Sequence, residues 1–290
     1  MLRDISEWEH IGHGGNSTLP KEELRAPDKR KYLIKYPRQV EEGVAWEDIT
    51  ELVAAKIAFI LGLESMEVEM VVRNGRQGCL LRNFVDERGP VANEEGGSLL
   101  AIFEDYDLLL KNELEGDELL KYGFNYIERL PYWESIKKSF IDMLFFDLLI
   151  GNQDRHPFNW MVLFYQDNTI QFPPIYDNGA SLGFRFEDSV LSDMIKKEPK
   201  MNQYTKRTKS KVGIFEKKQV KIKVLINFLF KEYPLESQLS VEKIKSFNLQ
   251  NYHDYIESLE ILSKEQRDWL LSIIPFRRRK ILQWIEEEGN

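Results

Sequence analysis

Residues 151–160, GNQDRHPFNW, form the most informative stretch of this sequence. An aspartate alone at a turn is common, because its side chain bonds to nearby backbone amides. Here, however, a carboxylate, an imidazole and two amides share one short polar turn between apolar stretches: Asp154, His156, Asn152 and Asn159. Such a combination is typical of a reaction centre. We therefore interpret the turn as a catalytic loop in which Asp154 is the acid–base group.

A hairpin after this turn brings a second carboxylate back to it. The apolar runs that flank Asp167-Asn168 predict that 160–165 pair with roughly 169–174. Because the two ends of a hairpin lie side by side, Asn159 and Asp177 become neighbours. An amide oxygen and a carboxylate at one point suit Mg²⁺, which takes few protein ligands and completes its shell with phosphate and water.

These spacings match those of protein kinases. The kinase catalytic loop, H-R-D-x-x-x-x-N, places a proton-accepting aspartate five residues before a magnesium-binding asparagine. Asp154 and Asn159 have that separation, and Asp177-Asn178-Gly179 stands where kinases carry D-F-G. The phenylalanine of D-F-G is absent here, so we expect no inactive state that depends on its movement.

The first part of the chain predicts a small α+β lobe. KYLIKYP, residues 31–37, alternates as a short strand that ends at its proline. A helix is expected over Glu47–Leu61, which carries an apolar stripe at helical spacing. Two further strands, Met66–Arg73 and Gly78–Phe84, flank the turn signal Asn74-Gly75.

Within this lobe, a lysine and a glutamate are expected to pair. Lys35 lies mid-strand on a face that should point inward, where a buried ammonium needs an opposite charge. Glu51 on the next helix is the favoured partner over Glu47, because acidic residues are expected at a helix start in any case. In kinases such a pair binds ATP phosphates. Upstream, the glycines of residues 10–21, HIGHGGNSTLPK, allow backbone N–H groups to approach phosphate oxygens closely.

The second part of the chain is mainly helical. Trp133–Ile150 predicts a strong amphipathic helix that ends at Gly151. We place the lobe boundary in the acidic, glycine-containing stretch 84–98. The chain then divides into a β-rich N-lobe, residues 1–90, and a larger helical C-lobe, residues 91–290, as a two-lobed α+β fold of the protein-kinase-like type.

Composition excludes several classes of protein. The single cysteine, Cys79, rules out a disulfide framework and a cysteine-type zinc site. The N-terminal residues lack the apolar run of a signal peptide. Phe140–Ile150 is the most apolar stretch, but two aspartates interrupt it and it is too short to span a bilayer. We expect a soluble, cytoplasmic protein that contacts no membrane.

Charge is unevenly distributed along this acidic chain. Residues 86–118 hold eleven acidic and two basic side chains, whereas residues 196–223 hold eleven basic and two acidic ones. Such a basic segment is either a solvated stretch without a partner or a contact for phosphate or an acidic partner. A binding role would place the segment near the site, and 181–212 is where an activation or substrate-binding loop is expected.

The sequence resembles the HipA-like serine/threonine kinases, a bacterial branch of the protein-kinase-like fold, and its catalytic motif is also similar to that of the phosphatidylinositol 3/4-kinases. Relative to the longer HipA toxins it begins almost at the glycine loop, so it is most similar to the short, stand-alone branch. The matching pieces occur in family order: GGNSTLPK (14–21), YLIKYP (32–37), ELVAAKIAFILGL (51–63), LLRNFVD (80–86), GNQDRHPFNW (151–160) and IYDNGASLG (175–183).

The resemblance implies a role for each matching residue. Asp154 would be the catalytic base, Asn159 and Asp177 would bind magnesium, and Lys35 with Glu51 would position the ATP phosphates. His156 would brace the catalytic loop. Backbone groups of a hinge would hold adenine, and a glycine loop would cover the phosphates: Arg82, Asn83, Phe84 and Val85 for the hinge, and Gly14, Gly15, Asn16 and Ser17 for the loop. Ser17, or Thr18 beside it, matches a serine whose autophosphorylation silences the enzyme in this family.

The implied activity is transfer of the ATP γ-phosphate to a protein serine or threonine, with ATP and Mg²⁺ at the site. The implied partners are a protein substrate linked to translation and an antitoxin, with no direct binding of DNA. Two alternatives stay open at this point. One is a lipid or small-molecule kinase of the phosphoinositide-kinase type. The other is a pseudokinase that serves as a regulatory binding module.

Overall fold

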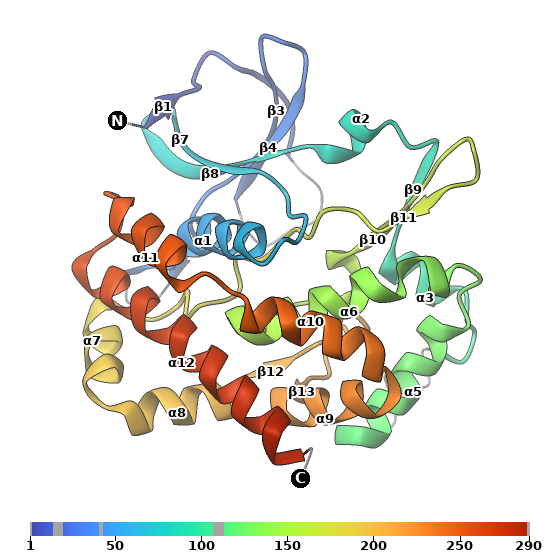
Figure 1. Ribbon diagram of the computed structural model, residues 1–290. Helices are drawn as coiled ribbons and strands as arrows, with labels where there is room; N and C mark the ends of the chain where they lie inside the picture. The colour runs from blue at the N-terminus through green and yellow to red at the C-terminus, as the bar shows by residue number, and fades with distance from the viewer. Residues whose placement is uncertain (1, 14–19, 41–42, 107–112, 289–290) are drawn as a thin grey trace.

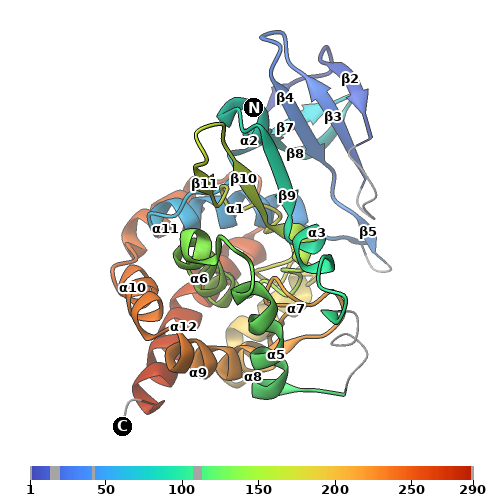
Figure 2. The same ribbon diagram turned by 90° about the vertical axis from the view of Figure 1, so that its right-hand side faces the viewer.

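The computed structural model describes residues 2–13, 20–40, 43–106 and 113–288. A curled β-sheet forms an N-lobe, and a larger, mainly helical C-lobe lies beneath it (Figures 1 and 2). The α+β, two-lobed fold class expected from the sequence is therefore confirmed. No helix among the described residues has both the length and the hydropathy needed to cross a membrane.

The N-lobe sheet has the strand order β1-β7-β8-β4-β3-β2 in the described part of the chain. Only the pairing of β1 with β7 is parallel, and the neighbours along the rest of this sheet are antiparallel. The strands predicted from the sequence are present within two residues of their expected ends. These predicted strands are β4 Lys31–Lys35, β7 Val68–Arg73 and β8 Arg76–Arg82. The sequence did not predict the other three strands of the sheet: β1 Arg3–Asp4, β2 Glu9–Gly12 and β3 Lys21–Arg25.

The two faces of this sheet carry different side chains and pack against different parts of the molecule. Tyr32, Ile34 and Tyr36 alternate onto one face, where they pack in a small core with Leu24 and Leu80. Lys35 lies on the opposite face, as the strand period of two requires. Helix α1, Glu47–Ile60, packs against β7 and β8 and joins the main core, which continues into the C-lobe. A short ribbon of β5 (Gln39–Val40) and β6 (Gly43–Val44) precedes the helix.

The acidic stretch in which we expected the lobe boundary is ordered. Phe84 does not extend the preceding strand as expected but begins a short helix, α2 (Phe84–Arg88), because the Asn83 side chain caps it. Strand β9, Ala92–Glu95, then pairs with the hairpin that follows the catalytic turn. The hairpin consists of β10 (Met161–Phe164) and β11 (Ile170–Gln171), and the resulting sheet, β11-β10-β9, lies between the lobes (Figure 2). The division at residues 90 and 91 stays a prediction.

Helix α6, Trp133–Ile150, forms the centre of the C-lobe and has the bounds that its sequence pattern predicts. Every residue from Phe140 to Ile150 is buried, including two aspartates, so each of these carboxylates needs a partner. Other helices surround α6: α3 (Gly96–Ala101), α5 (Gly116–Glu128), α9 (Ile222–Glu232), α10 (Pro234–Lys245), α11 (Leu249–Ser258) and α12 (Lys264–Glu288).

A buried arginine joins α12 to the end of α6. Arg277 donates hydrogen bonds to the carbonyl oxygens of Leu148 and Leu149, at 2.6 and 2.9 Å, and to Thr208 Oγ1. These carbonyls belong to the last turn of α6. Carbonyl oxygens in a last turn have no donor within the helix and carry partial negative charge. Burial lowers the pKa of Arg277 to about 10, which leaves it charged at neutral pH.

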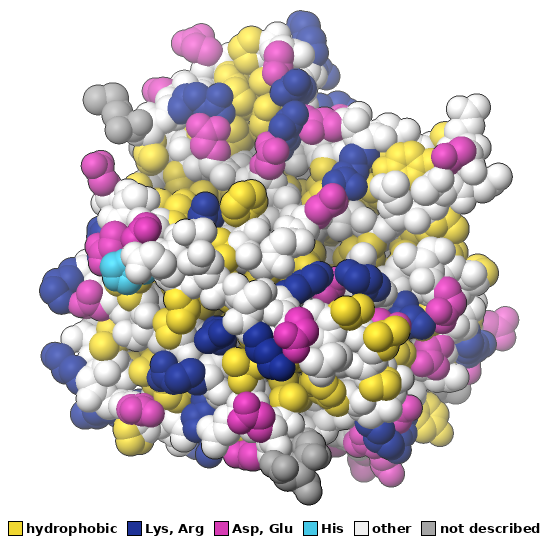
Figure 3. Space-filling view, in the orientation of Figure 1, with side chains coloured by type: hydrophobic (Ala, Val, Ile, Leu, Met, Phe, Trp, Pro, Cys, Tyr) yellow, Lys and Arg dark blue, Asp and Glu magenta, His cyan; other side chains and the backbone are white. Residues whose placement is uncertain are grey.

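The basic segment is not an open loop. It contains α7 (Asp188–Lys196) and α8 (Glu198–Arg207), followed by a small ladder of β12 (Lys209–Ser210) with β13 (Val220–Lys221). Buried Leu191, Met194 and Met201 anchor these helices, and α7 packs on α12. The face seen in Figure 3 carries basic and acidic side chains interspersed, so any charge-based docking depends on local groups.

Candidate active site

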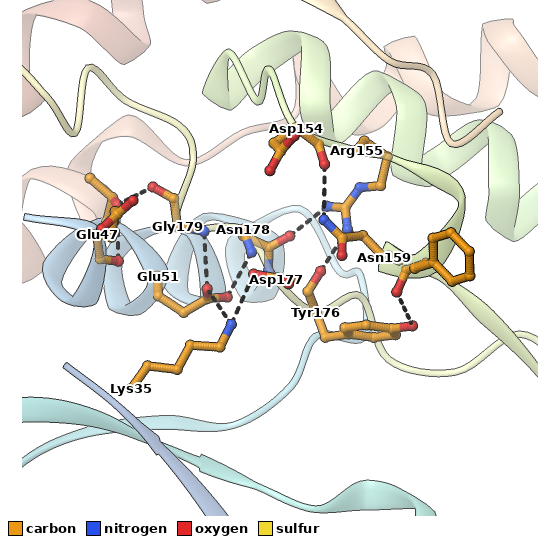
Figure 4. Close-up of polar contacts among 12 residues, drawn as sticks. Lys35, Glu47, Glu51, Asp154, Arg155, Asn159, Tyr176, Asp177, Asn178 and Gly179 are labelled. Atoms are coloured by element: carbon orange, nitrogen blue, oxygen red, sulfur yellow. Dashed lines mark hydrogen bonds and ion pairs between the residues drawn. The ribbon is translucent and has the colours of Figure 1, made fainter. Parts of the chain in front are cut away.

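Three charged residues meet where the N-lobe faces the C-lobe (Figure 4). The Nζ atom of Lys35, on β4, lies 2.9 Å from Asp177 Oδ1 and 3.6 Å from Glu51 Oε2. Glu51 is buried in α1, and the Lys35 side chain is only 12% exposed. The expected pairing of Lys35 with Glu51 is therefore present, and it extends to Asp177. Glu47 instead pairs with Arg38, at 2.9 Å.

Electrostatics shift the pKa values of Lys35 and Asp177 in the directions that favour their charged forms. Burial alone would lower the pKa of Lys35, but the carboxylates of Asp177 and Glu51 outweigh it and raise that pKa. Burial would likewise raise the pKa of Asp177, yet Lys35 and then Arg155 hold it below its usual value. A lysine kept protonated next to partly exposed carboxylate oxygen is suited to bind phosphate oxygens.

Glu51 also holds the turn that contains Asp177. Its two carboxylate oxygens accept the backbone N–H groups of Asn178, at 2.8 Å, and Gly179, at 3.0 Å. Thr50 Oγ1 donates to the Gly179 carbonyl oxygen at 2.6 Å. A Cβ atom at Gly179 would lie 2.9 Å from the backbone oxygen of Glu47, which explains why glycine ends the Asp-Asn-Gly motif. One helix thus positions both the lysine and the aspartate.

Arg155 is the centre of a buried network that sequence reasoning did not single out. Its fully buried guanidinium contacts both carboxylate oxygens of Asp147 on α6, at 2.8 and 2.9 Å. It also donates to the carbonyl oxygens of Asn159 and Tyr176 and to Asn178 Oδ1, at 2.9, 2.6 and 2.6 Å. The two ends of the hairpin therefore converge on one side chain, as Figure 4 shows.

Hydrogen bonds hold the catalytic turn itself. The buried Asn152 donates to Asp147 Oδ1 and accepts the backbone N–H of Asp154, at 3.0 and 2.9 Å. His156 Nδ1 accepts the N–H of Phe158 and so caps a single 3₁₀ turn, Pro157–Asn159. Burial lowers the pKa of His156, so its ring is neutral at pH 7. His156 thus makes a hydrogen bond within the catalytic turn, and its role in bracing this turn stays a prediction.

The donor set at the end of the hairpin fits a hard cation. The Asn159 side chain donates its Nδ2 to the Asp154 carbonyl oxygen, at 2.9 Å, which leaves Oδ1 as its acceptor. Asp177 carries its carboxylate on a left-handed backbone, φ 58°, and its side chain is 41% exposed. One amide and one carboxylate oxygen match the needs of Mg²⁺ bound together with phosphate. Among the described residues, no group of three or more His, Cys, Asp or Glu side chains could hold a metal ion by itself.

Two lysines that the sequence did not single out join the site, from stretches expected to lie near it: residues 10–21 and 181–212. Lys211 Nζ lies 2.5 Å from Asp154 Oδ1. Lys21 lies directly opposite Lys35 across the β3–β4 ladder, and burial together with the Lys35 charge lowers the pKa of Lys21. Like charges opposite each other destabilise a sheet, and an anion between them would offset this repulsion.

The remaining predicted residues lie near the N-lobe edge. In the hinge, the backbone N–H groups of Arg82, Asn83 and Val85 donate to the Glu67 carbonyl, the Lys31 carbonyl and the Asn83 side chain. Hydrogen bonds to an adenine would have to come from other groups of this segment. The glycine-loop residues lie outside the described residues: Gly14, Gly15, Asn16, Ser17 and Thr18. The strands that flank them, β2 and β3, pair antiparallel.

Comparison with known proteins supports the fold. No protein-family model matches the sequence, and no curated protein sequence matches it. Among solved structures, the proinflammatory kinase CtkA of Helicobacter pylori is similar with a TM-score of 0.79 and 19% identity, over 99% of this chain and 98% of that one. HipA of Shewanella oneidensis MR-1, solved with HipB and operator DNA, is similar with a TM-score of 0.58 and 15% identity, over 99% and 67% of the two chains. The chain therefore has a HipA-like kinase fold.

We expect Arg155→Lys to lower the free energy of unfolding by about 3 kcal/mol, although the charge is kept. Lysine cannot reproduce the two parallel hydrogen bonds that the guanidinium donates to Asp147. A buried carboxylate that loses such a partner destabilises the folded state. Chemical denaturation would measure the change. The matched control is Arg185→Lys at an exposed arginine, which should change stability by less than about 0.5 kcal/mol. Equal small effects of the two substitutions would contradict the role given to Arg155.

Proposed function

We propose that this protein is an ATP-dependent serine/threonine protein kinase. The observation that carries the proposal is the meeting of Lys35, Glu51 and Asp177 beside the turn that holds Asp154 and Asn159, on a HipA-like kinase fold. Strand, helix, turn and hairpin each supply the residue type that phosphoryl transfer requires. Composition and fold alone would fit many activities, so the argument rests on this geometry.

Each residue has a defined part in the proposed reaction. Lys35, held by Glu51, binds phosphate oxygens of ATP. Asp154 accepts the proton of the substrate hydroxyl as that oxygen bonds to the γ-phosphorus. The bond from this phosphorus to the bridging oxygen breaks, and ADP leaves with the bonding electrons. Asn159 and Asp177 would hold Mg²⁺, which supplies charge neutralisation at the phosphates.

Positioning carries most of the catalysis in such a reaction, because the protein forms no covalent bond to the phosphoryl group. The buried contacts of Arg155 and Glu51 satisfy this need. They fix the backbone on both sides of Asp177 and the backbone after Asp154. The intact set of charged residues favours an active enzyme over a pseudokinase that only binds a partner.

The first test is intact-mass spectrometry of the purified protein before and after incubation with Mg-ATP. Added phosphate would show kinase chemistry, and peptide mapping would then test Ser17 and Thr18 as regulatory sites. Parallel assays with protein and lipid acceptors would separate a protein kinase from a phosphoinositide-type kinase. Absence of both phosphate and ATP binding would favour the binding-module alternative.

Asp154→Asn should lower phosphate transfer at least about a hundredfold, the usual contribution of a general base. ATP affinity should stay close to that of the wild type, because the carboxylate is placed to meet the acceptor hydroxyl. Transfer would be measured as phosphate incorporation, and affinity by calorimetry. Asp167→Asn, at the exposed tip of the hairpin, is the control and should retain activity. A loss below tenfold, or about 1.4 kcal/mol of barrier, would contradict the assignment of Asp154.

We further propose that the basic segment binds the protein substrate. On α8, Lys206 and Arg207 are exposed and line a surface hollow together with Pro199, Lys200 and Asn202. Exposed cations without a buried role attract acidic surfaces and raise the rate of encounter. The substrate would then present an acidic surface. Proteins associated with tRNA or translation are the candidates to test. An antitoxin partner is a second proposal for this surface.

The double substitution Lys206→Glu with Arg207→Glu should weaken substrate phosphorylation more than ATP hydrolysis. The reversed charges repel an acidic acceptor, whereas the nucleotide site lies elsewhere in the fold. Steady-state rates of both reactions would be compared at low and moderate salt, because screening reduces such an effect. Lys206→Arg with Arg207→Lys is the charge-preserving control. Equal losses in the two reactions would argue against a substrate-binding role.

A further inference from the structure

The contact between Lys211 and Asp154 is not explained by the roles assigned so far. The two side chains come from distant parts of the sequence, yet Nζ and Oδ1 lie 2.5 Å apart. Asp154 is the proposed general base, so its carboxylate must stay open to the substrate hydroxyl, yet the ammonium already contacts Oδ1. The contact therefore opposes the reaction unless the ammonium has another anionic partner at the same point.

The backbone around Lys211 is held without help from its side chain. Gly213 donates its N–H to the Arg155 carbonyl oxygen at 2.6 Å, and Trp160 Nε1 donates to the Gly213 carbonyl oxygen at 2.7 Å. Ser210 Oγ accepts the N–H of Val212 at 3.1 Å. The segment is thus clamped to the catalytic turn directly after Lys211. An ion pair with Asp154 is not needed to keep it in place.

The conformation of this clamp is strained. Val212 is buried and has a φ of 61°, in the left-handed region that β-branched residues rarely adopt. Gly213 follows with a φ of 70°. Strained backbone persists where the surrounding structure over-determines it, and it is concentrated at functional sites. Here the effect of two consecutive left-handed residues is to turn the chain so that Lys211 lies next to Asp154.

We propose, on the basis of the proposed kinase function, that Lys211 is a further catalytic residue, whose ammonium bridges Asp154 and the γ-phosphoryl group of ATP. The negative phosphoryl oxygens and the Asp154 carboxylate must approach the same hydroxyl and would otherwise repel each other. A cation shared between them removes this repulsion. It also stabilises the charge on the phosphoryl oxygens as the bond to ADP breaks. Proton transfer runs from the substrate hydroxyl to Asp154, and the ammonium takes no part in it.

The test uses the γ-phosphate as the discriminating group. Calorimetry would give the affinities of wild type and Lys211→Met for the non-hydrolysable ATP analogue AMP-PNP and for ADP, both with Mg²⁺. We expect Lys211→Met to weaken AMP-PNP binding about tenfold and to change ADP binding less than twofold, since the loss of one charge-assisted contact concerns only the γ-phosphate. Lys211→Arg should restore part of the AMP-PNP affinity, and Lys211→Gln serves as a second neutral variant.

The controls separate a catalytic role from a structural one. Lys264→Met removes an exposed lysine that pairs with Asp268 on α12 and should change neither affinity. An unchanged ratio of AMP-PNP to ADP affinity in Lys211→Met would overturn the proposal and leave the kinase function standing, because Lys211 would then contact only protein. Failure of the wild type to bind either nucleotide would overturn both.

Discussion

The buried ion pair between Arg155 and Asp147 is the contact on which the rest of the site depends. Asp147 lies in the last turn of a fully buried stretch of helix and needs a counter-charge. Arg155 supplies it and still has donors left, because a guanidinium carries five N–H groups in a fixed fork. Those donors reach the carbonyls of Asn159 and Tyr176 and the side chain of Asn178. The charge that stabilises α6 therefore also sets the positions of the catalytic turn and of both hairpin ends.

Glu51 extends this constraint to the N-lobe. It accepts hydrogen bonds from the backbone of the Asp177 turn and pairs with Lys35 on the sheet. The start of α1 is tied to the C-lobe as well, since Trp46 donates its backbone N–H to the Phe184 carbonyl at 3.0 Å. Movement of α1 away from this position would separate Glu51 from Lys35 and would release the backbone of the Asp177 turn. The helix thus couples the placement of Lys35 to that of Asp177, the residues proposed to bind phosphate and metal.

The sequence predicted those parts of the fold that depend on residues close together in the chain. The bounds of α6, the strand with Lys35 and the hairpin after Asn159 all follow from hydrophobic periodicity and turn residues, which act over a few positions. The role of Arg155 was missed because an arginine beside a catalytic aspartate looks like a solvated charge until the burial of α6 is known. Lys211 was missed for a different reason: residues 181–212 were expected near the site, but no local pattern singles out this one lysine as a contact of Asp154. The helices α7 and α8 were not predicted, because their many basic residues suggested a loop. Leu191 and Met194 do lie at helical spacing within α7.

The distribution of charge explains how so many ionic groups can share one site. Lys35 lies between two carboxylates, Lys211 contacts a third, and Arg155 contacts a fourth. Each carboxylate thus has a cation beside it, which limits the cost of bringing acidic groups together in a partly buried place. The two lysines differ from Arg155 in being less buried, so their ammonium groups can be shared with an incoming anion while the guanidinium keeps the scaffold in place. In the proposed function, Arg155 therefore has the structural role, and the two lysines have the role of binding phosphate.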